Sequence, residues 1–110
     1  MDDIEAIKQL TARYNRAFDL IDVPAYLATW TTDGLFHRSN AERPYQGHDD
    51  LSVLLSTYPV RGRHVTSDYI ISVDGDRAQQ SCYLLYLDVN DAFKVVMFGT
   101  YADELVREDD

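Results

Sequence analysis

The chain has 110 residues, of which 45% are hydrophobic, and its 19 acidic against 10 basic residues give a formal net charge of −9. This length fits a single domain over residues 1–110, and the composition is too apolar for an intrinsically disordered chain. The negative charge argues against nucleic acid and anionic membranes as partners, no apolar run reaches the ~18 residues of a membrane span, and no segment resembles a signal peptide. We therefore expect a cytoplasmic protein.

The first half of the chain has the periodicity of amphipathic helices. Apolar residues recur at helical spacing over residues 2–21, in a stripe formed by Ile4, Ile7, Leu10, Tyr14, Phe18 and Ile21. Asp22 can cap a second, short helix that has Pro24 in its first turn. After a short strand predicted over residues 35–41, a third helix is expected from position 48 or 49 to the residue before Pro59.

The second half of the chain has the pattern of long strands. Residues 64–73 lead into Asp74-Gly75-Asp76, a strong hairpin signal, and a second strand is predicted over residues 78–89. A turn at Asn90-Asp91 then leads to a third strand over residues 93–106. Helices followed by an antiparallel meander predict an α+β fold in which the helices cover one face of the sheet.

The middle strand is apolar on both faces. Both alternating sets of residues 81–89 hold large apolar groups: Cys82, Leu84 and Tyr86 in one set, Tyr83, Leu85 and Leu87 in the other. An antiparallel strand with one face in water alternates more cleanly than this. We therefore predict that helices cover one face and a second subunit covers the other, in a homodimer formed through the sheet face.

Few residues carry an obvious chemical signature. The spacings of His37, His48 and His64 match no metal-ligand motif, and there is no nucleophile elbow, phosphate-binding loop or dinucleotide fingerprint. We expect neither a metal site nor an organic cofactor. The single Cys82 cannot form an internal disulfide, and its place in mid-strand is typical of a small core residue.

Three polar residues are of interest because of their positions. Asp19 lies near the end of the first helix, where its charge opposes the helix dipole by ~0.3–1 kcal/mol and calls for a partner, a functional reason or full solvation. Tyr14 belongs to the apolar stripe, and a buried phenol needs a hydrogen-bond partner from protein, water or ligand. His64 opens the first long strand, where strict alternation groups it with every second residue up to position 70. The residues of that face are both polar and apolar, so the pattern does not distinguish a structural from a catalytic role of His64.

Several short motifs follow one another in the order of a known family. They are Arg13-Tyr14 with Phe18-Asp19, Trp30-Thr31-Thr32-Asp33-Gly34, Gly62-Arg63-His64-Val65 and Val73-Asp74-Gly75-Asp76-Arg77-Ala78. In these motifs, and over nearly its whole length, the chain resembles the SnoaL-like branch of the nuclear-transport-factor-like superfamily. The resemblance implies a cone, with a strongly curved antiparallel sheet wrapped around about three N-terminal helices and a pocket between them. The family's usual C-terminal Gly-Trp-Arg strand has no counterpart in this sequence.

The resemblance also implies a site. Scytalone dehydratase, bile-acid dehydratase and hexachlorocyclohexane dehydrochlorinase use a His–Asp pair. The aspartate lies late in the first helix, and the histidine lies on the strand that follows the third helix. Asp19 and His64 occupy those places. Bile-acid dehydratase and ketosteroid isomerase place a catalytic tyrosine in the first helix, and Tyr14 matches that position.

The chain departs from these relatives at other positions. Phe18 and His37 stand where scytalone dehydratase has the two tyrosines that hold its catalytic water, and Cys82 stands where it has a second histidine. The basic aspartate of ketosteroid isomerase falls near Arg38 or Ser39, which disfavours that isomerase mechanism.

The implied residues define a hypothesis about function. Asp19 would orient His64, His64 would take a proton from a carbon acid, and Tyr14 would donate a hydrogen bond to the oxygen on which charge develops. With a leaving group on the neighbouring carbon, this is a cofactor-free elimination, so we predict a dehydratase-like lyase or isomerase. The predicted ligand is a small apolar or aromatic, cyclic molecule, and the predicted pocket walls are Phe18, Trp30, His37, Tyr83 and Phe98, the last two from strand position only.

Other functions remain open for the same fold. The chain could be a non-catalytic ligand-binding or dimerisation module, a polyketide cyclase or an epoxide hydrolase. A contact between His64 and Asp19 inside a closed pocket would favour the enzyme, whereas Asp19 in bulk water would favour the module.

Overall fold

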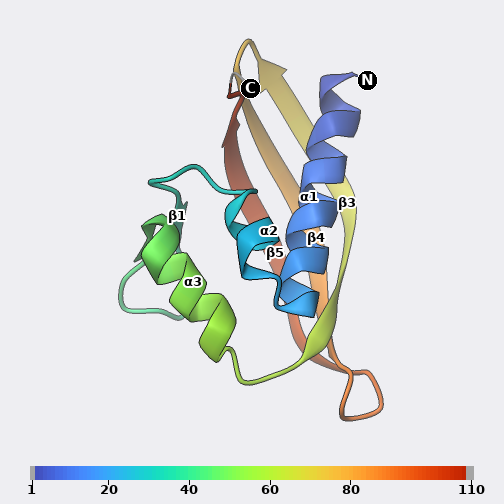
Figure 1. The fold of residues 1–110 in the computed structure, drawn as a ribbon. Helices are drawn as coiled ribbons and strands as arrows, with labels where there is room; N and C mark the ends of the chain where they lie inside the picture. Colours follow the sequence, from blue (N-terminus) through green and yellow to red (C-terminus); the bar gives the residue numbers. More distant parts are fainter. Residues whose placement is uncertain (1, 109–110) are drawn as a thin grey trace. The chain divides into compact units, whose positions relative to one another are not determined.

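The structure is a computed structural model that describes residues 2–108 (Figure 1). Helices come first and long strands last, in the order α1 (Asp3–Leu20), α2 (Val23–Leu27), β1 (Leu35–Phe36), β2 (Tyr45–Gln46), α3 (Gly47–Thr57), β3 (Gly62–Asp74), β4 (Arg77–Asp88) and β5 (Lys94–Val106). The three long strands form a curved antiparallel sheet. The predicted α+β fold class is confirmed.

The chain divides into two compact units. The sheet unit consists of the residues up to Gln9 and the chain from Gly62 onward, and it holds β3, β4, β5 and the beginning of α1. The helical unit is Leu10–Arg61, with the rest of α1, helices α2 and α3, and the short strands. None of the helices in residues 2–108 combines the length and the apolarity that a membrane crossing requires.

Local hydrogen bonds define both ends of α1. The Glu5 N–H donates to Oδ1 of Asp2 at 2.8 Å, which satisfies one of the free donors at the start of the helix. After Leu20 two backbone hydrogen bonds of 3.1 and 2.9 Å close the last turn in the pattern of a Schellman motif. Ile21 there has φ = 56°, a left-handed conformation that glycine usually provides. Asp19 therefore lies in a helical turn whose end is set by the backbone.

The buried face of α1 differs from the predicted apolar stripe. Ile4 is 46% exposed, whereas the buried residues of the helix are Thr11, Asn15, Ala17 and Phe18. Two of these residues are polar, and a pattern of apolar residues cannot predict that polar side chains are buried. The helix itself is confirmed, but its buried face was predicted correctly only in part.

The rest of the helical unit follows the predicted pattern closely. Asp22 caps α2 by accepting a hydrogen bond from the Ala25 N–H at 3.1 Å, with Pro24 in the first turn. Helix α3 begins at Gly47, one or two residues earlier than predicted, and buries Leu51, Leu54 and Leu55. The predicted strand over residues 35–41 is shorter in the structure, because only Leu35–Phe36 pairs with Tyr45–Gln46.

The sheet unit is a meander with strand order β3-β4-β5. The predicted hairpin is confirmed, with Asp74 opposite Arg77 and Gly75 at φ = 61° in the turn. A β-bulge interrupts the β3–β4 register between Ser67 and Ile70, and Asp68 within it has φ = 57°. Because the bulge adds a residue, it reverses the alternation of β3, so that Ile70 points away from the face that carries His64.

The two faces of the sheet differ strongly in exposure. The inner face is defined here by the buried side chains of β4, which are Ala78, Gln80, Cys82, Leu84 and Tyr86. The outer face is the opposite one, and it carries the exposed side chains Val65, Ile70, Tyr83, Val95 and Phe98. Cys82 is 1% exposed, which confirms its prediction as a core residue.

Candidate functional site

His64 lies on the inner face of the sheet. It is half-buried on β3, directly opposite Tyr86 on β4. The two rings have their centroids 4.7 Å apart at an interplanar angle of 57°. Tyr86 is buried, so the imidazole packs against a fixed aromatic wall. Packing of this kind restricts the rotation of the imidazole ring.

Gly62 makes the packing beside His64 possible. A Cβ atom at this position would collide with the carbonyl oxygen of Leu87 and would come 2.6 Å from the Tyr86 ring. Only glycine therefore lets the Tyr86 ring lie over the start of β3. The Gly62-Arg63-His64 motif thus has a steric reason for its glycine.

Asp103 is a chemically interesting residue that the sequence prediction missed. It lies on β5 opposite Gln80, whose side chain is buried and whose Nε2 donates a hydrogen bond to Oδ2 of Asp103 at 3.1 Å. Burial raises the pKa of the Asp103 carboxyl, and the hydrogen bond from Gln80 opposes that rise. A carboxyl of this kind holds a proton at pH values where an ordinary aspartate has lost it. In the sequence Asp103 precedes Glu104, and only the strand register shows which of the two faces inward.

Cys82 lies next to Gln80 on the same face. Burial, with a further contribution from the negative charge of Asp103, raises the pKa of its thiol to about 11. The group is therefore a neutral thiol near pH 7 and not a nucleophile. The inner face presents an imidazole at one end and an acid–amide pair towards the other.

Tyr14 lies in an aromatic cluster of the helical unit. Its ring centroid is 5.3 Å from that of Tyr26 and 5.9 Å from that of Trp30. Tyr26 is 0% exposed, and the sequence prediction did not include it. Tyr14 and Trp30, both predicted site residues, are thus brought together by a third aromatic residue.

Two polar atoms in this cluster are buried without a hydrogen bond of good geometry. They are the Tyr26 hydroxyl and Trp30 Nε1, for which no partner lies within bonding distance and angle in residues 2–108. Burial raises the pKa of the Tyr26 phenol, and hydrogen bonding to the Tyr14 and Trp30 side chains, although not of good geometry, reduces that rise. Each unsatisfied buried group costs ~1–3 kcal/mol, so an oxygen atom of a ligand or of water at this position would be stabilised.

The other predicted residues lie in different surroundings. Asp19 is half-buried in the last turn of α1, and it belongs to the helical unit while His64 belongs to the sheet unit, so their pairing stays a prediction. Phe18 is buried against Tyr26 and Tyr58, with ring centroids 5.8 and 5.2 Å apart. His37 is exposed in the segment after β1.

Tyr83 and Phe98 are not part of the surface that carries His64. They lie on the outer face of the sheet, 47% and 69% exposed, with their ring centroids 6.1 Å apart. They were predicted as pocket walls from their positions in the strands, and the sequence does not show which alternate residues of a strand face inward. The register of β4 and β5 places Phe98 opposite Leu85, on the face away from Cys82 and Tyr86.

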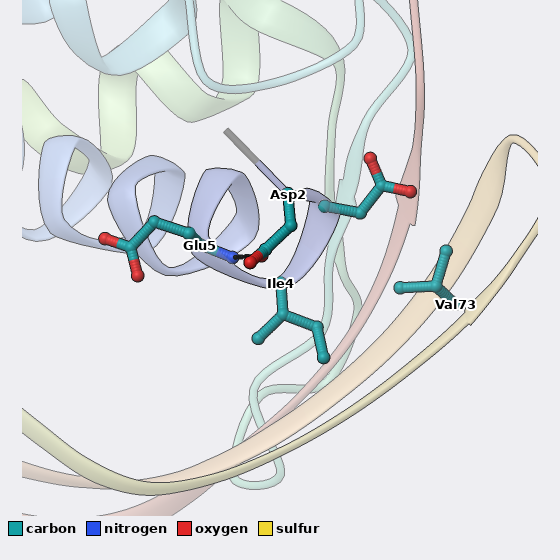
Figure 2. Close-up of a pocket in the computed structure, with 5 residues that line it drawn as sticks. Asp2, Ile4, Glu5 and Val73 are labelled. Atoms are coloured by element: carbon teal, nitrogen blue, oxygen red, sulfur yellow. Dashed lines mark hydrogen bonds between the residues drawn. The ribbon is translucent and has the colours of Figure 1, made fainter.

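A surface hollow lies elsewhere, at the beginning of α1. It measures about 420 Å³ and is lined by Asp2, Asp3, Ile4, Glu5 and Val73 (Figure 2). Figure 2 shows the hydrogen bond from the Glu5 N–H to Asp2 beside it. None of the predicted site residues lines this hollow. Within residues 2–108 no group of three or more His, Cys, Asp or Glu side chains is arranged to hold a metal ion.

Comparison with known proteins identifies the family. The model of the SnoaL-like domain matches residues 1–110. Among solved structures, Rv3472 of Mycobacterium tuberculosis, a protein of unknown function, is 29% identical over 97% of this chain, with a TM-score of 0.89. This chain spans 64% of the length of that protein, just under two thirds.

Two further structures extend the likeness. A protein of unknown function with a cystatin-like fold from Nostoc punctiforme is 27% identical, with a TM-score of 0.82 over 94% of this chain and 79% of its own. A candidate scytalone dehydratase from Novosphingobium aromaticivorans is 18% identical, with a TM-score of 0.77 over 97% of this chain and 75% of its own, and shows the likeness of fold alone. A search of curated proteins found no match. With the family model covering residues 1–110, the chain belongs to the family of SnoaL-like domains.

Proposed function

We propose that the chain is a small-molecule lyase or isomerase of the dehydratase type, in which His64 is the base, Asp19 orients it and Tyr14 donates a hydrogen bond to the substrate. The observation that carries the proposal is the position of His64. Its ring is half-buried on the inner face of the sheet, packed against Tyr86, on the same face as the acid–amide pair of Asp103 and Gln80. The SnoaL-like family includes dehydratases and isomerases, which supports this class of reaction.

The chemistry follows from the residue types. His64 takes a proton from the carbon next to a carbonyl group, and the electron pair of that C–H bond forms the new double bond as the bond to a hydroxyl on the next carbon breaks. The hydroxyl leaves with the proton that His64 has taken, so the products are an unsaturated carbonyl compound and water. Tyr14 stabilises the negative charge that develops on the carbonyl oxygen. Asp103, a carboxyl with a raised pKa, is a second possible donor to a substrate oxygen.

The aromatic cluster indicates the kind of ligand. Tyr14, Tyr26 and Trp30 offer ring surfaces together with two buried polar atoms that make no hydrogen bond of good geometry within residues 2–108. Such a combination suits a cyclic molecule with one or two oxygen atoms better than a phosphorylated or highly charged one. Cyclic β-hydroxyketones are therefore the first compounds to test.

The same cluster also favours a second candidate function. A protein that only binds a small molecule needs ring surface and polar donors, but it needs no base. The unsatisfied Tyr26 hydroxyl and Trp30 Nε1 serve such binding without any role for His64. In this alternative the protein binds the same class of ligand but catalyses no reaction.

The test compares variants at His64 and Asp19. With a panel of cyclic β-hydroxyketones, we expect wild-type protein to produce the ultraviolet absorbance of a conjugated enone, and His64→Ala to lower turnover by ~10²–10⁴-fold. Asp19→Asn should also impair turnover, and the double variant should be no worse than His64→Ala, because both residues serve one proton transfer. Glu104→Gln, at an exposed acid on the opposite face of the sheet, is the control and should keep full turnover.

Nuclear magnetic resonance of the histidine rings distinguishes the two candidate functions. If Asp19 accepts a hydrogen bond from His64, Asp19→Asn should change the tautomer distribution of the His64 ring in ¹H–¹⁵N spectra, while His37 and His48 stay unchanged. Unaltered His64 signals, with ligand-induced thermal stabilisation that survives His64→Ala, would support the binding module and contradict the enzyme.

A further inference from the structure

The turn between β4 and β5 has a backbone conformation that its residues do not favour. In Figure 1 this β4–β5 turn, residues 89–93, is the orange loop that projects beyond the beginning of β3. Ala92 and Phe93 have φ = 54° and 56°, and the Lys94 N–H donates a hydrogen bond to the Asp91 carbonyl at 3.1 Å. Two consecutive left-handed residues closed in this way are typical of a type I′ turn, in which Asn-Gly is the usual pair. Both central residues therefore stand where the backbone favours glycine or asparagine.

Phe93 is the more unusual of the two residues. A bulky side chain is rare in the left-handed region, because its Cβ atom crowds the backbone carbonyl oxygen. Burial does not compensate for this strain, since Phe93 is 58% exposed. Elsewhere the chain follows the usual rule, with Gly75 at φ = 61° in the β3–β4 hairpin. Strain that packing does not offset concentrates at functional positions, which makes the β4–β5 turn a candidate for a functional role.

The β4–β5 turn lies at the end of the sheet that carries His64. The Phe93 N–H donates a hydrogen bond to the Asp88 carbonyl at 2.9 Å, and Asp88 pairs with Gly62 at the start of β3. His64 is two residues further along β3, which is ~7 Å at the rise of an extended strand. A phenylalanine side chain and a cyclic molecule together span more than this distance. A ring carried by the turn can therefore contact a ligand bound at His64.

We propose that the β4–β5 turn is a cover for the site at His64, and that the Phe93 ring closes onto the bound substrate. In the open form described above, the turn hydrogen bond and the ion pair of Lys94 with Asp91 at 2.7 Å hold the left-handed backbone in place. Closure takes φ of Phe93 to the extended region and buries its ring against the ligand. Strain relief and apolar burial then act together, but only a ligand supplies the surface that is buried. The cover rests on the proposed function, because it needs a substrate at His64.

The chemistry of the cover narrows the ligand class. A phenyl ring has no hydrogen-bonding group, so it packs on the face of a ligand and leaves the polar atoms of that ligand to other residues. It favours a flat, apolar ring over an open-chain molecule of the same polarity. The inferred substrate is therefore a flat cyclic ketone whose ring face lies under Phe93.

Two glycine substitutions test the strain without any ligand. We expect Phe93→Gly and Ala92→Gly each to raise the midpoint of urea unfolding, because glycine adopts a positive φ without a steric penalty. Circular dichroism checks that both variants keep the fold. A midpoint that does not rise in Phe93→Gly would mean that the open turn stores no strain, and it would overturn the cover.

Binding of 1-tetralone, a flat cyclic ketone, tests the contact itself. In isothermal titration calorimetry, Phe93→Gly should bind about tenfold more weakly than wild type, because it loses the apolar surface of the ring. Ala92→Gly is the matched control, since it relieves the same kind of strain and keeps the ring, and its affinity should equal that of wild type. Phe93→Leu should recover most of the affinity. With the hydroxyketone panel, Phe93→Gly should raise KM and leave kcat nearly unchanged.

The outcomes separate the cover from the proposed function. If Phe93→Gly binds 1-tetralone as tightly as wild type and turnover is present, the cover is wrong and the proposed function stands. Weaker binding by Phe93→Gly in a protein without turnover would keep the cover and remove the reaction. If wild type binds neither 1-tetralone nor any compound of the panel, the proposed function fails and the cover fails with it. An equal loss of affinity in Ala92→Gly and Phe93→Gly would trace the effect to the flexibility of the turn and overturn the role of the ring.

Discussion

Asp103 and Cys82 lie close together on the inner face of the sheet, and burial changes the chemistry of both. Burial raises the pKa of each group, and the carboxylate charge of Asp103 adds to the effect on Cys82. Gln80 holds Asp103 in place with a hydrogen bond from a buried amide. At the scale of single residues, this part of the inner face therefore favours the neutral, protonated forms of Cys82 and Asp103.

The raised pKa of Asp103 has a consequence for stability. A carboxyl whose pKa is higher in the folded than in the unfolded chain contributes stability below its ordinary pKa of 3.8, and that contribution is lost as the pH rises through the folded-state pKa. Asp103→Asn removes the ionisable group and keeps an oxygen that accepts from Gln80. We expect this variant to be more stable than wild type at pH 7 and to lose that advantage below about pH 4.

Urea unfolding at pH 7 and pH 3.5 measures this effect. Glu104→Gln is the matched control, because Glu104 is the adjacent acid on the exposed outer face and should show no such pH-dependent gain. An Asp103→Asn variant that is destabilised more at pH 7 than at pH 3.5 would show that the carboxylate has a favourable partner in the folded state and would contradict the raised pKa.

The beginning of β3 shows how an element positions a candidate base. Gly62 opens the strand, the Tyr86 ring of β4 lies over it, and His64 packs against the same ring two residues later. The position of the imidazole therefore depends on the absence of a side chain at Gly62. The bulge further along β3 acts on the other face, where it moves Ile70 outward and opens a hollow beside Tyr83.

Substitution of Gly62 tests this dependence. Gly62→Ala should destabilise the fold by ~1–3 kcal/mol, because the new Cβ collides with a backbone oxygen that has little room to move. It should also shift the ring signals of His64 and Tyr86. Gly99→Ala is the control, since a Cβ at Gly99 has no atom within 4 Å, and it should leave stability unchanged or slightly raised. Equal effects of the two substitutions would remove the steric role of Gly62.

At the scale of the whole molecule, the reactivity of the Cys82 thiol measures how often the sheet unfolds. This thiol lies on the central strand of the sheet, is almost fully buried, and has a pKa of about 11. Local fluctuations at strand ends do not expose it. The reactivity of this single thiol should therefore follow the unfolding of the sheet unit.

We expect Cys82 to react with a thiol reagent at pH 8 many-fold more slowly in native protein than in 6 M urea. If unfolding limits the reaction, its rate should become independent of reagent concentration at high reagent. Fast modification of the folded protein would mean that the sheet opens locally at its centre.

Much of the fold follows from local physical rules that act within a few residues. The 3.6-residue period indicated α1 and α3, the Asp22 cap with Pro24 indicated α2, and Asp74-Gly75-Asp76 indicated the β3–β4 hairpin. The family resemblance pointed to the SnoaL-like domain, and the family match over residues 1–110 confirms it. The helical period, the cap and the hairpin motif depend on near neighbours in the chain, and the resemblance depends on the order of motifs along it, so a sequence displays both directly.

Only the tertiary structure decided which side chains share a face and which share an interior. The bulge at Ser67–Ile70 breaks the alternation from which side-chain directions on β3 were inferred, and the β4–β5 register turns Asp103 inward and Phe98 outward. Tyr26 meets Tyr14 and Trp30 through packing between helices that no local pattern encodes. Which residues of a strand face inward, and which side chains meet in a core, depends on residues far apart in the chain. The sequence alone therefore determined the elements, while the folded molecule determined the composition of the candidate site.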